Sequence, residues 1–179
     1  MGYLTNLSSD FINLPSSITN LDIAFGKRDI KEIEKAERQL ITSLRIPPTP
    51  SDYPSCMSMI GEFRSYLSHN NRTVRTLAAQ VIIKLVSWAL VLAGVFFGSS
   101  KSALKNVAKE LLDILNETNN LQNDGSINLS LGSLGEFNSL IRYIKENILD
   151  KNNTEDNNSI NKLSIKINNT DEFVANSTD

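Results

Sequence analysis

The sequence predicts a mainly α-helical protein, a compact bundle around one central hydrophobic helix at about residues 73–97. Two observations lead to this prediction. The segment VIIKLVSWALVLAGVFFG, residues 81–98, is apolar nearly all round, which is typical of a helix buried in protein or in lipid. The segments on either side carry apolar residues at helical spacing between charged ones, so each needs an apolar partner. A buried central helix supplies that partner.

The N-terminal region, residues 1–28, has scattered apolar residues interrupted by proline and serine, and we expect an irregular arm there. A helical domain is expected over residues 29–149. Its first helix begins at Asp29, which can cap the helix, with Glu32 three residues later as in a capping box. The helix ends before Pro47, because proline lacks the N–H that a helix interior needs.

A Pro-rich linker is predicted at residues 46–54, within RIPPTPSDYPS. Its four prolines favour an extended chain with local polyproline character. A spacer is the simpler interpretation. The alternative is a peripheral docking segment, because a preorganised chain with an exposed tyrosine loses little entropy on binding. The docking candidates are Pro47, Pro48, Pro50 and Tyr53.

Three further helices accompany the central one. A short amphipathic helix is expected over residues 55–68, and the polar HNNRT segment ends it. After the central helix, Ser100 can cap the clearest amphipathic helix of the chain. Ser133 and Glu136 form a second capping-box pattern, which predicts that another amphipathic helix begins there.

Two late segments alternate apolar and polar residues, at 126–131 and 162–167. Such alternation indicates short strands, and the two could pair. Residues 150–179 are otherwise polar and rich in asparagine, with little to bury. We therefore expect a flexible polar tail.

Composition restricts the environment of the protein and its partners. With 18 basic and 20 acidic residues the net charge is -2, so the positive field typical of nucleic-acid binding is missing. Cys56 is the only cysteine, which excludes an intrachain disulfide and fits a reducing compartment. The N-terminal residues lack the pattern of a secretory signal. An intracellular, cytoplasmic protein that is not secreted is expected, with association to a membrane or a virion as alternatives.

No catalytic motif is recognisable. His69 is the only histidine and lies in a polar turn, where we expect it to be exposed. Neither the H-E-x-x-H nor the C-x-x-C metal pattern occurs. The Gly-Lys pair in FGKRD lacks the first glycine and the Ser or Thr of the phosphate-binding motif G-x-x-x-x-G-K-[ST]. The acidic residues fall mostly on the polar faces of predicted helices. We therefore expect a non-enzyme without a cofactor, a metal or a small-molecule substrate.

The apolar segment could lie in a membrane or in a protein core. Its uncharged part, residues 85–98, is 14 residues long, or about 21 Å as a helix, against a hydrocarbon thickness near 30 Å. Extending it to residues 77–98 brings in Lys84, which costs up to roughly 3 kcal/mol in a bilayer. Trp88 would then lie mid-span rather than at the interface. A core helix is favoured, with membrane insertion or an oligomer interface as alternatives.

Two segments match parts of known motifs. The matching residues are Met57, Gly61 and Glu62 in the first segment, and Trp88, Ala93, Phe97 and Gly98 in the second. They resemble the L-x-x-x-G-D and N-W-G-R-I-V-x-x-x-x-F-G motifs of the B-cell-lymphoma family of apoptosis regulators, which implies a helical fold and a role in apoptosis. Leu90 stands where the second motif has its partner-binding arginine, and the spacing between the motifs is shorter here.

Together these features predict a non-catalytic helical interaction or assembly protein. Its richness in asparagine would suit a virus or an AT-rich microbe, and a viral matrix or accessory protein is a plausible form of such a protein. A protein partner, self-association or a membrane surface would be its target. The candidate contact residues lie along the apolar segment: Ile82, Lys84, Leu85, Trp88, Leu92, Phe96 and Phe97.

Overall fold

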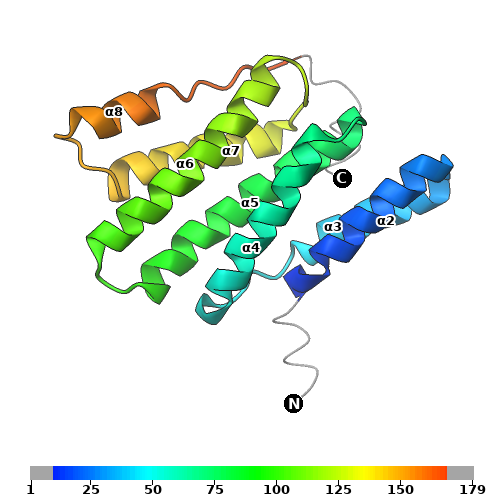
Figure 1. Ribbon diagram of the computed structural model, residues 1–179, viewed down its shortest axis with the longest axis horizontal. Coiled ribbons are helices and arrows are strands. Elements are labelled where there is room, and N and C mark those ends of the chain that lie inside the picture. The colour runs from blue at the N-terminus through cyan, green and yellow to red at the C-terminus, as the bar shows by residue number, and fades with distance from the viewer. Residues whose placement is uncertain (1–9, 169–179) are drawn as a thin grey trace. The chain divides into compact units, whose positions relative to one another are not determined.

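A computed structural model describes residues 10–168 of the chain (Figure 1). Over this range there are seven α-helices, three short 3-10 helices and no strand, which confirms the mainly α-helical fold class. The chain divides into two compact units, residues 1–88 and 89–179. The boundary falls inside α5 (Arg72–Phe96), a helix that continues through it without a break. That residues 29–149 form one domain stays a prediction.

The first unit begins with a helix where an irregular arm was expected. A 3-10 turn, η1 (Asp10–Asn13), leads into α2 (Leu14–Lys27), so the expectation for residues 1–28 is wrong over this part. Proline did not prevent the helix because it lies in the first turn, where its missing N–H is not needed. Leu14, Ile18 and Leu21 share one face and are at most 1% exposed. Residues 1–9 lie outside the described residues.

Helix α3 (Ile30–Ser43) packs against α2. The Asp29 side chain accepts a hydrogen bond from the Glu32 backbone N–H, so the predicted N-cap is confirmed. Ala36 and Leu40 form the buried face, each 2% exposed, whereas Ile30 is 71% exposed. The two helices are drawn side by side in blue in Figure 1.

The Pro-rich linker is shorter and more ordered than expected. Residues 44–49 lack regular structure, and η2 (Pro50–Asp52) leads directly into α4 (Tyr53–Arg64). The Asp52 carboxylate accepts hydrogen bonds from the Thr49 N–H at 2.8 Å and the Thr49 hydroxyl at 2.9 Å. This carboxylate satisfies polar groups at the helix start and fixes the direction of the linker.

Helices α4 and α5 complete the first unit, joined by the turn η3 (Ser65–Ser68). The buried face of α4 includes Cys56, Ile60 and Phe63, at most 1% exposed. Burying a side chain such as Phe63 stabilises the fold by about 1.5–3 kcal/mol. After the turn, the Asn71 side chain accepts a hydrogen bond from Val74 N–H at 3.1 Å, and α5 starts at that point.

The central apolar helix is present, one residue earlier than the expected 73–97 at each end. In its first half Val74, Ile82, Ile83 and Leu85 are completely buried. Among the described residues, α5 alone is long and apolar enough to cross a membrane, and 61% of its most apolar stretch is buried in the protein. A core helix of a soluble protein meets the same criteria, so this is weak evidence for a membrane span.

The second unit contains the end of α5 followed by α6 (Lys101–Asn123), α7 (Leu131–Asn147) and α8 (Thr154–Asn161). Ser100 caps α6 as expected, accepting a hydrogen bond from Ala103 N–H. Helix α7 begins before the predicted position. Its N-cap is Ser130, which accepts from the Ser133 N–H, so Ser133 lies within the first turn and is not the cap.

The expected pairing of strands 126–131 and 162–167 does not form. Instead, amide side chains at the end of α6 hold residues 163–168, which lack regular structure. The Gln122 amide donates to Lys166 O at 3.0 Å, and the Asn123 amide donates to Ser164 O at 3.1 Å while accepting from Lys166 N–H at 2.6 Å. Side-chain amides therefore satisfy the backbone groups that a strand partner would have satisfied.

The Asn-rich tail is helical over α8, so the expectation of a flexible tail is wrong for this part. Asp156 and Ile160, at 2% and 3% exposed, face inward from the helix. The Asp156 carboxylate lies 2.8 Å from Lys105 Nζ on α6 and accepts a hydrogen bond from Asp150 N–H at 3.1 Å. An ion pair whose carboxylate is buried and whose lysine is partly exposed therefore anchors a helix with mostly polar residues. Residues 169–179 lie outside the described range.

Candidate functional site

The last two turns of α5 carry apolar residues that face outward. Val91, Val95 and Phe96 are 58%, 62% and 48% exposed, whereas Leu92 and Ala93 beside them are 6% and 0% exposed. Val91 and Val95 are four residues apart, so they occupy the same face of the helix. We call this exposed end, comprising Val91, Val95, Phe96 and Phe97, the α5 tip.

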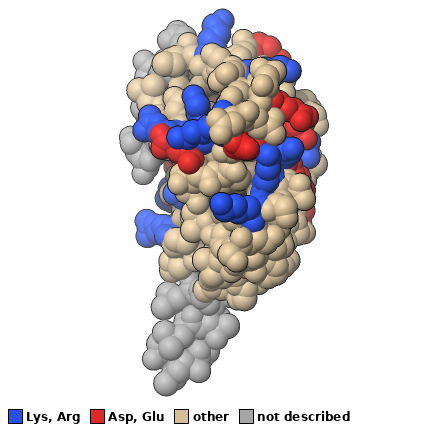
Figure 2. Space-filling view, turned by 90° about the vertical axis from the view of Figure 1, so that its left-hand side faces the viewer, with Lys and Arg blue, Asp and Glu red and all other residues tan. Residues whose placement is uncertain are grey.

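The α5 tip ends in a short turn that leads to α6. The rings of Phe96 and Phe97 meet edge to face, with centroids 5.2 Å apart. Gly98 follows with φ of 63°, a left-handed conformation that glycine adopts without strain. Lys101 opens α6 and is exposed. The α5–α6 turn lies low on the left of Figure 1, and Figure 2 views the protein from that side.

Trp88 and Lys84 lie one and two turns before the α5 tip. The ammonium nitrogen of Lys84 is 5.8 Å from the centroid of the Trp88 ring, within the range of a cation–π interaction. Both side chains are half-buried. Lys84 is therefore partly exposed, with its ammonium group beside the Trp88 ring.

The predicted contact residues divide into three groups by exposure. Ile82 and Leu85 are completely buried and Leu92 is nearly so. Lys84, Trp88 and Phe97 are half-buried, and Phe96 is exposed. Whether these residues contact a partner stays a prediction, but the three buried ones contribute to the core of the free protein.

Val91 and Val95 were missed by the sequence analysis. Every neighbour is also apolar, so residue type alone does not distinguish the outward face from the inward one. The helical period was the available signal. Ile82 and Leu85 lie on the buried face of the helix, and steps of 3.6 residues continue this face through Ala89 and Ala93. Val91 and Val95 do not fall on it.

The Pro-rich docking candidates do not form one exposed surface. Pro47 and Pro50 are exposed, but Pro48 is buried and Tyr53 is only 7% exposed. Tyr53 was expected to be exposed, and that expectation is wrong because it begins α4 and its ring joins the core. The segment lacks the outward aromatic residue on which the docking interpretation depended.

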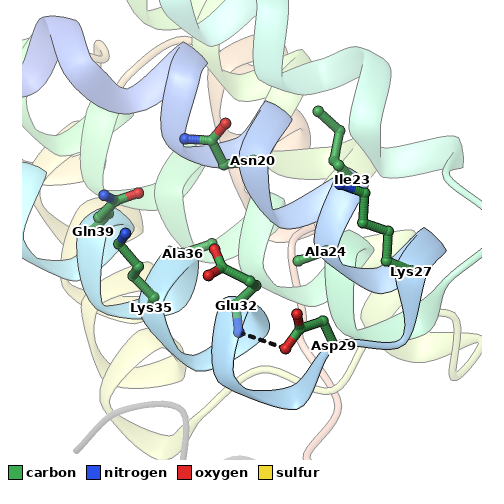
Figure 3. A pocket seen from close by; sticks show the side chains of 9 residues that line it. All are labelled: Asn20, Ile23, Ala24, Lys27, Asp29, Glu32, Lys35, Ala36 and Gln39. Atoms are coloured by element: carbon green, nitrogen blue, oxygen red, sulfur yellow. Dashed lines mark hydrogen bonds between the residues drawn. The ribbon is translucent and has the colours of Figure 1, made fainter.

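A hollow of about 450 Å³ lies between α2 and α3 (Figure 3). Basic side chains, Lys27 and Lys35, and acidic ones, Asp29 and Glu32, both line it. Asp29 is already engaged by the Glu32 backbone N–H, the dashed line in Figure 3. This mixture of charges offers no uniform field for an ionic ligand.

The two groups most suited to nucleophilic chemistry are used in packing. Burial, with a smaller contribution from Asp52, raises the pKa of Cys56 to about 12, and its thiol donates to Leu85 O at 3.5 Å. His69 was expected to be exposed, and that is wrong: its Nε2 lies 2.6 Å from the Asp22 carboxylate, and its Nδ1 accepts from Asn71 N–H. Both ring nitrogens are therefore occupied by the fold.

Within residues 10–168, no group of three or more His, Cys, Asp or Glu side chains lies close enough to hold a metal ion.

The fold and the α5 tip define the class of protein. It is mainly helical, and its most apolar helix is buried over most of its length and exposed at its end. Comparison with protein families, curated proteins and solved structures finds no match to the chain. The resemblance to the B-cell-lymphoma family stays a prediction.

Proposed function

We propose that the protein is non-catalytic and acts by surface contact, with the α5 tip as its contact surface. The observation that supports this most directly is the exposure of Val91, Val95 and Phe96, at 58%, 62% and 48%. A helix on the surface of a soluble protein normally turns polar residues outward. Neighbouring exposed apolar residues often indicate an interaction surface.

The electrostatics of the titratable groups support a non-catalytic role. Catalytic groups commonly have a shifted pKa and stand in a cleft. Here the pKa of Cys56 is raised by burial in the core, and the shifts of Lys105 and Asp156 come chiefly from their mutual hydrogen bond. Burial, with a smaller contribution from the charge of Glu34, also raises the pKa of Glu37. The shifts of Cys56, Lys105 and Asp156 therefore have structural causes at positions that stabilise the fold.

The sequence also suggested a membrane-inserting protein that uses residues 77–98. The burial of 61% of the most apolar stretch of α5 makes a fully spanning helix the less favoured proposal, because the buried part would have to leave its packing partners. A contact confined to the α5 tip requires no such rearrangement. The viral origin and the cytoplasmic location remain predictions.

Photocrosslinking from the α5 tip tests the proposal. A benzophenone amino acid is placed at Val95 in the full-length chain, and in a second variant at Ile30, which is 71% exposed on α3. After irradiation in cells, adducts are identified by mass as a second copy of the chain or as phospholipid. We expect adducts from position 95 at least about five times as abundant as from position 30, because contact surfaces exclude water from their core.

Equal adduct yields from the two positions would contradict the proposal. The Ile30 variant is a matched control, since both positions replace an exposed β-branched residue on an α-helix. Circular dichroism of both variants checks that the helical content is unchanged.

A further inference from the structure

We infer that the α5 tip contacts the surface of an anionic lipid bilayer; this inference rests on the proposed role of the tip as the contact surface. The chemistry of the tip identifies the partner: acyl chains suit its exposed apolar residues, and acidic headgroups suit the basic residues of the same segment of the chain.

The first argument is the distribution of charge along the chain. No acidic residue occurs from Phe63 to Lys109, a stretch of 47 residues that contains α5. The same stretch carries seven basic residues: Arg64, Arg72, Arg75, Lys84, Lys101, Lys105 and Lys109. Lys105 is paired with Asp156 and Arg75 donates to the backbone oxygen of His69, so these two are engaged within the fold. The chain as a whole has a net charge of -2, so the rest of it is acidic. The exposed apolar residues thus lie in the one long segment that complements a negative surface.

The second argument is the chemistry of the exposed side chains. The side chains of Val91, Val95 and Phe96 have no hydrogen-bonding groups, whereas protein interfaces are enriched in tyrosine, tryptophan and arginine at their energetic centres. Acyl chains require no polar complementarity. The edge-to-face pair of Phe96 and Phe97 extends this apolar surface to the turn where the helix ends.

The third argument is size. With a phenylalanine contributing about 200 Å² when fully exposed, the three exposed residues present on the order of 300 Å². A stable protein interface takes about 800 Å² from each partner. A small apolar surface combined with basic residues is instead sufficient for reversible attachment at a bilayer interface.

Basic residues stand on both sides of the α5 tip. Lys84 precedes it on α5 and is half-buried with its ammonium group over the Trp88 ring, so it adds positive charge before the tip. Lys101 follows it and is exposed at the start of α6. Lys101 also lines a hollow of about 630 Å³ with Glu146 and Asp150, which offsets part of its charge. Attachment therefore depends on several basic residues acting together.

Vesicle sedimentation with the full-length protein tests the inference. Vesicles of phosphatidylcholine with 30% phosphatidylserine are compared with vesicles of phosphatidylcholine alone, at low and high salt. We expect at least about tenfold stronger partitioning to the anionic vesicles, weakened by 0.5 M salt because the attraction is screened. Trp88, the single tryptophan, lies one turn from Val91, and its emission should shift to the blue on binding.

Two pairs of variants separate the apolar and the electrostatic contributions. Replacing Val91, Val95 and Phe96 together by serine should lower partitioning about tenfold, whereas Leu131→Ser, at a site that is 64% exposed on α7, should leave it unchanged. Lys84→Gln with Lys101→Gln should reduce the preference for anionic vesicles. Lys31→Gln with Lys35→Gln, both exposed on α3, should not. The single change Phe96→Ser serves if the triple variant misfolds.

The outcomes distinguish this inference from the proposed function. If the protein ignores anionic vesicles while crosslinks from position 95 join two copies of the chain, the tip is a contact surface and the lipid inference is wrong. If position 95 gives no more adducts than position 30 and vesicles are not bound, both are wrong. If the serine variants bind vesicles as well as the natural chain does, the tip is not the attachment surface.

Discussion

His69 Nε2 lies 2.6 Å from Asp22 Oδ1, a hydrogen bond between residues 47 positions apart that ties α2 to the turn before α5. The Asn71 backbone N–H donates to Nδ1 at 2.9 Å, so in the neutral ring Nε2 carries the proton and donates it to the carboxylate. The imidazole therefore holds the turn before α5 against α2 within the first unit.

Replacing His69 by alanine removes both hydrogen bonds. We expect the free energy of unfolding to fall by about 1–2 kcal/mol, the usual value for two partly exposed hydrogen bonds of this kind. Urea denaturation followed by circular dichroism measures the change. Ser68→Ala, next to it and exposed, is the control, with an expected loss below about 0.5 kcal/mol. Equal stability of the His69 variant and the natural chain would show that the pair contributes nothing.

The ion pair between Lys105 and Asp156 predicts that the attachment of α8 depends on pH. The hydrogen bond from Lys105 lowers the pKa of Asp156 below its ordinary value of 3.8. A carboxyl group whose pKa is lowered by folding stabilises the fold above the unfolded value, and this contribution disappears as the pH falls through the folded value. We therefore expect α8 to stay attached at pH 5 and to loosen progressively below pH 3.8.

Hydrogen exchange of residues 154–161 measures this effect, after correction for the intrinsic dependence of exchange on pH. Asp156→Asn should lower the exchange protection of the α8 amides about tenfold already at neutral pH. In this variant the protection should no longer change as the pH falls. Glu155→Gln, on the exposed side of the same helix, should behave as the natural chain does. Unchanged protection of α8 in the Asp156 variant would rule out the ion pair as its anchor.

Gln122 is completely buried and connects two segments of the second unit. Its Oε1 accepts from Leu129 N–H at 2.9 Å and its Nε2 donates to Lys166 O at 3.0 Å. Gln122→Ala leaves a buried N–H without its acceptor, and we expect a loss of about 1–3 kcal/mol in unfolding free energy. Faster hydrogen exchange at Leu129 and Lys166 would accompany it. Gln39→Ala, exposed on α3, is the control.

The thiol of Cys56 should be inert in the folded protein. Its pKa is raised to about 12, and the side chain is completely buried. Because only the thiolate reacts, and each pKa unit changes its fraction tenfold, reaction with an aromatic disulfide at pH 8 should be at least about 1000-fold slower than in urea. Rapid reaction of the folded chain would mean that the α4–α5 contact opens frequently.

Regular patterns allowed much of the fold to be predicted from the sequence. The length and uniform hydrophobicity of the central helix identified α5 to within one residue at each end. Asp29 and Ser100 were identified as caps because each precedes an apolar periodicity by the right interval. The α2 helix was missed because its proline was interpreted as a break, although a proline in the first turn is compatible with a helix.

The remaining errors concern relations between distant residues. That His69 meets Asp22, and that Gln122 and Asn123 hold residues 163–168, depends on which surfaces come together in three dimensions. The abundance of asparagine suggested a flexible chain. The side-chain amides of Gln122 and Asn123 instead form the hydrogen bonds to residues 163–168 that a neighbouring strand would have formed. The outward position of Val91 and Val95 depended on the direction of the buried face, which residue type does not reveal.

The inertness of Cys56, the only cysteine of the chain, also matters for experimental design. A cysteine introduced at Val95 or Leu131, both exposed, would be the only reactive thiol in the natural background. A spin label or a fluorophore could then be attached at one chosen position without replacing a residue of the core. Spectroscopy could follow the end of the apolar helix as it leaves water, in a protein whose packing is otherwise unchanged.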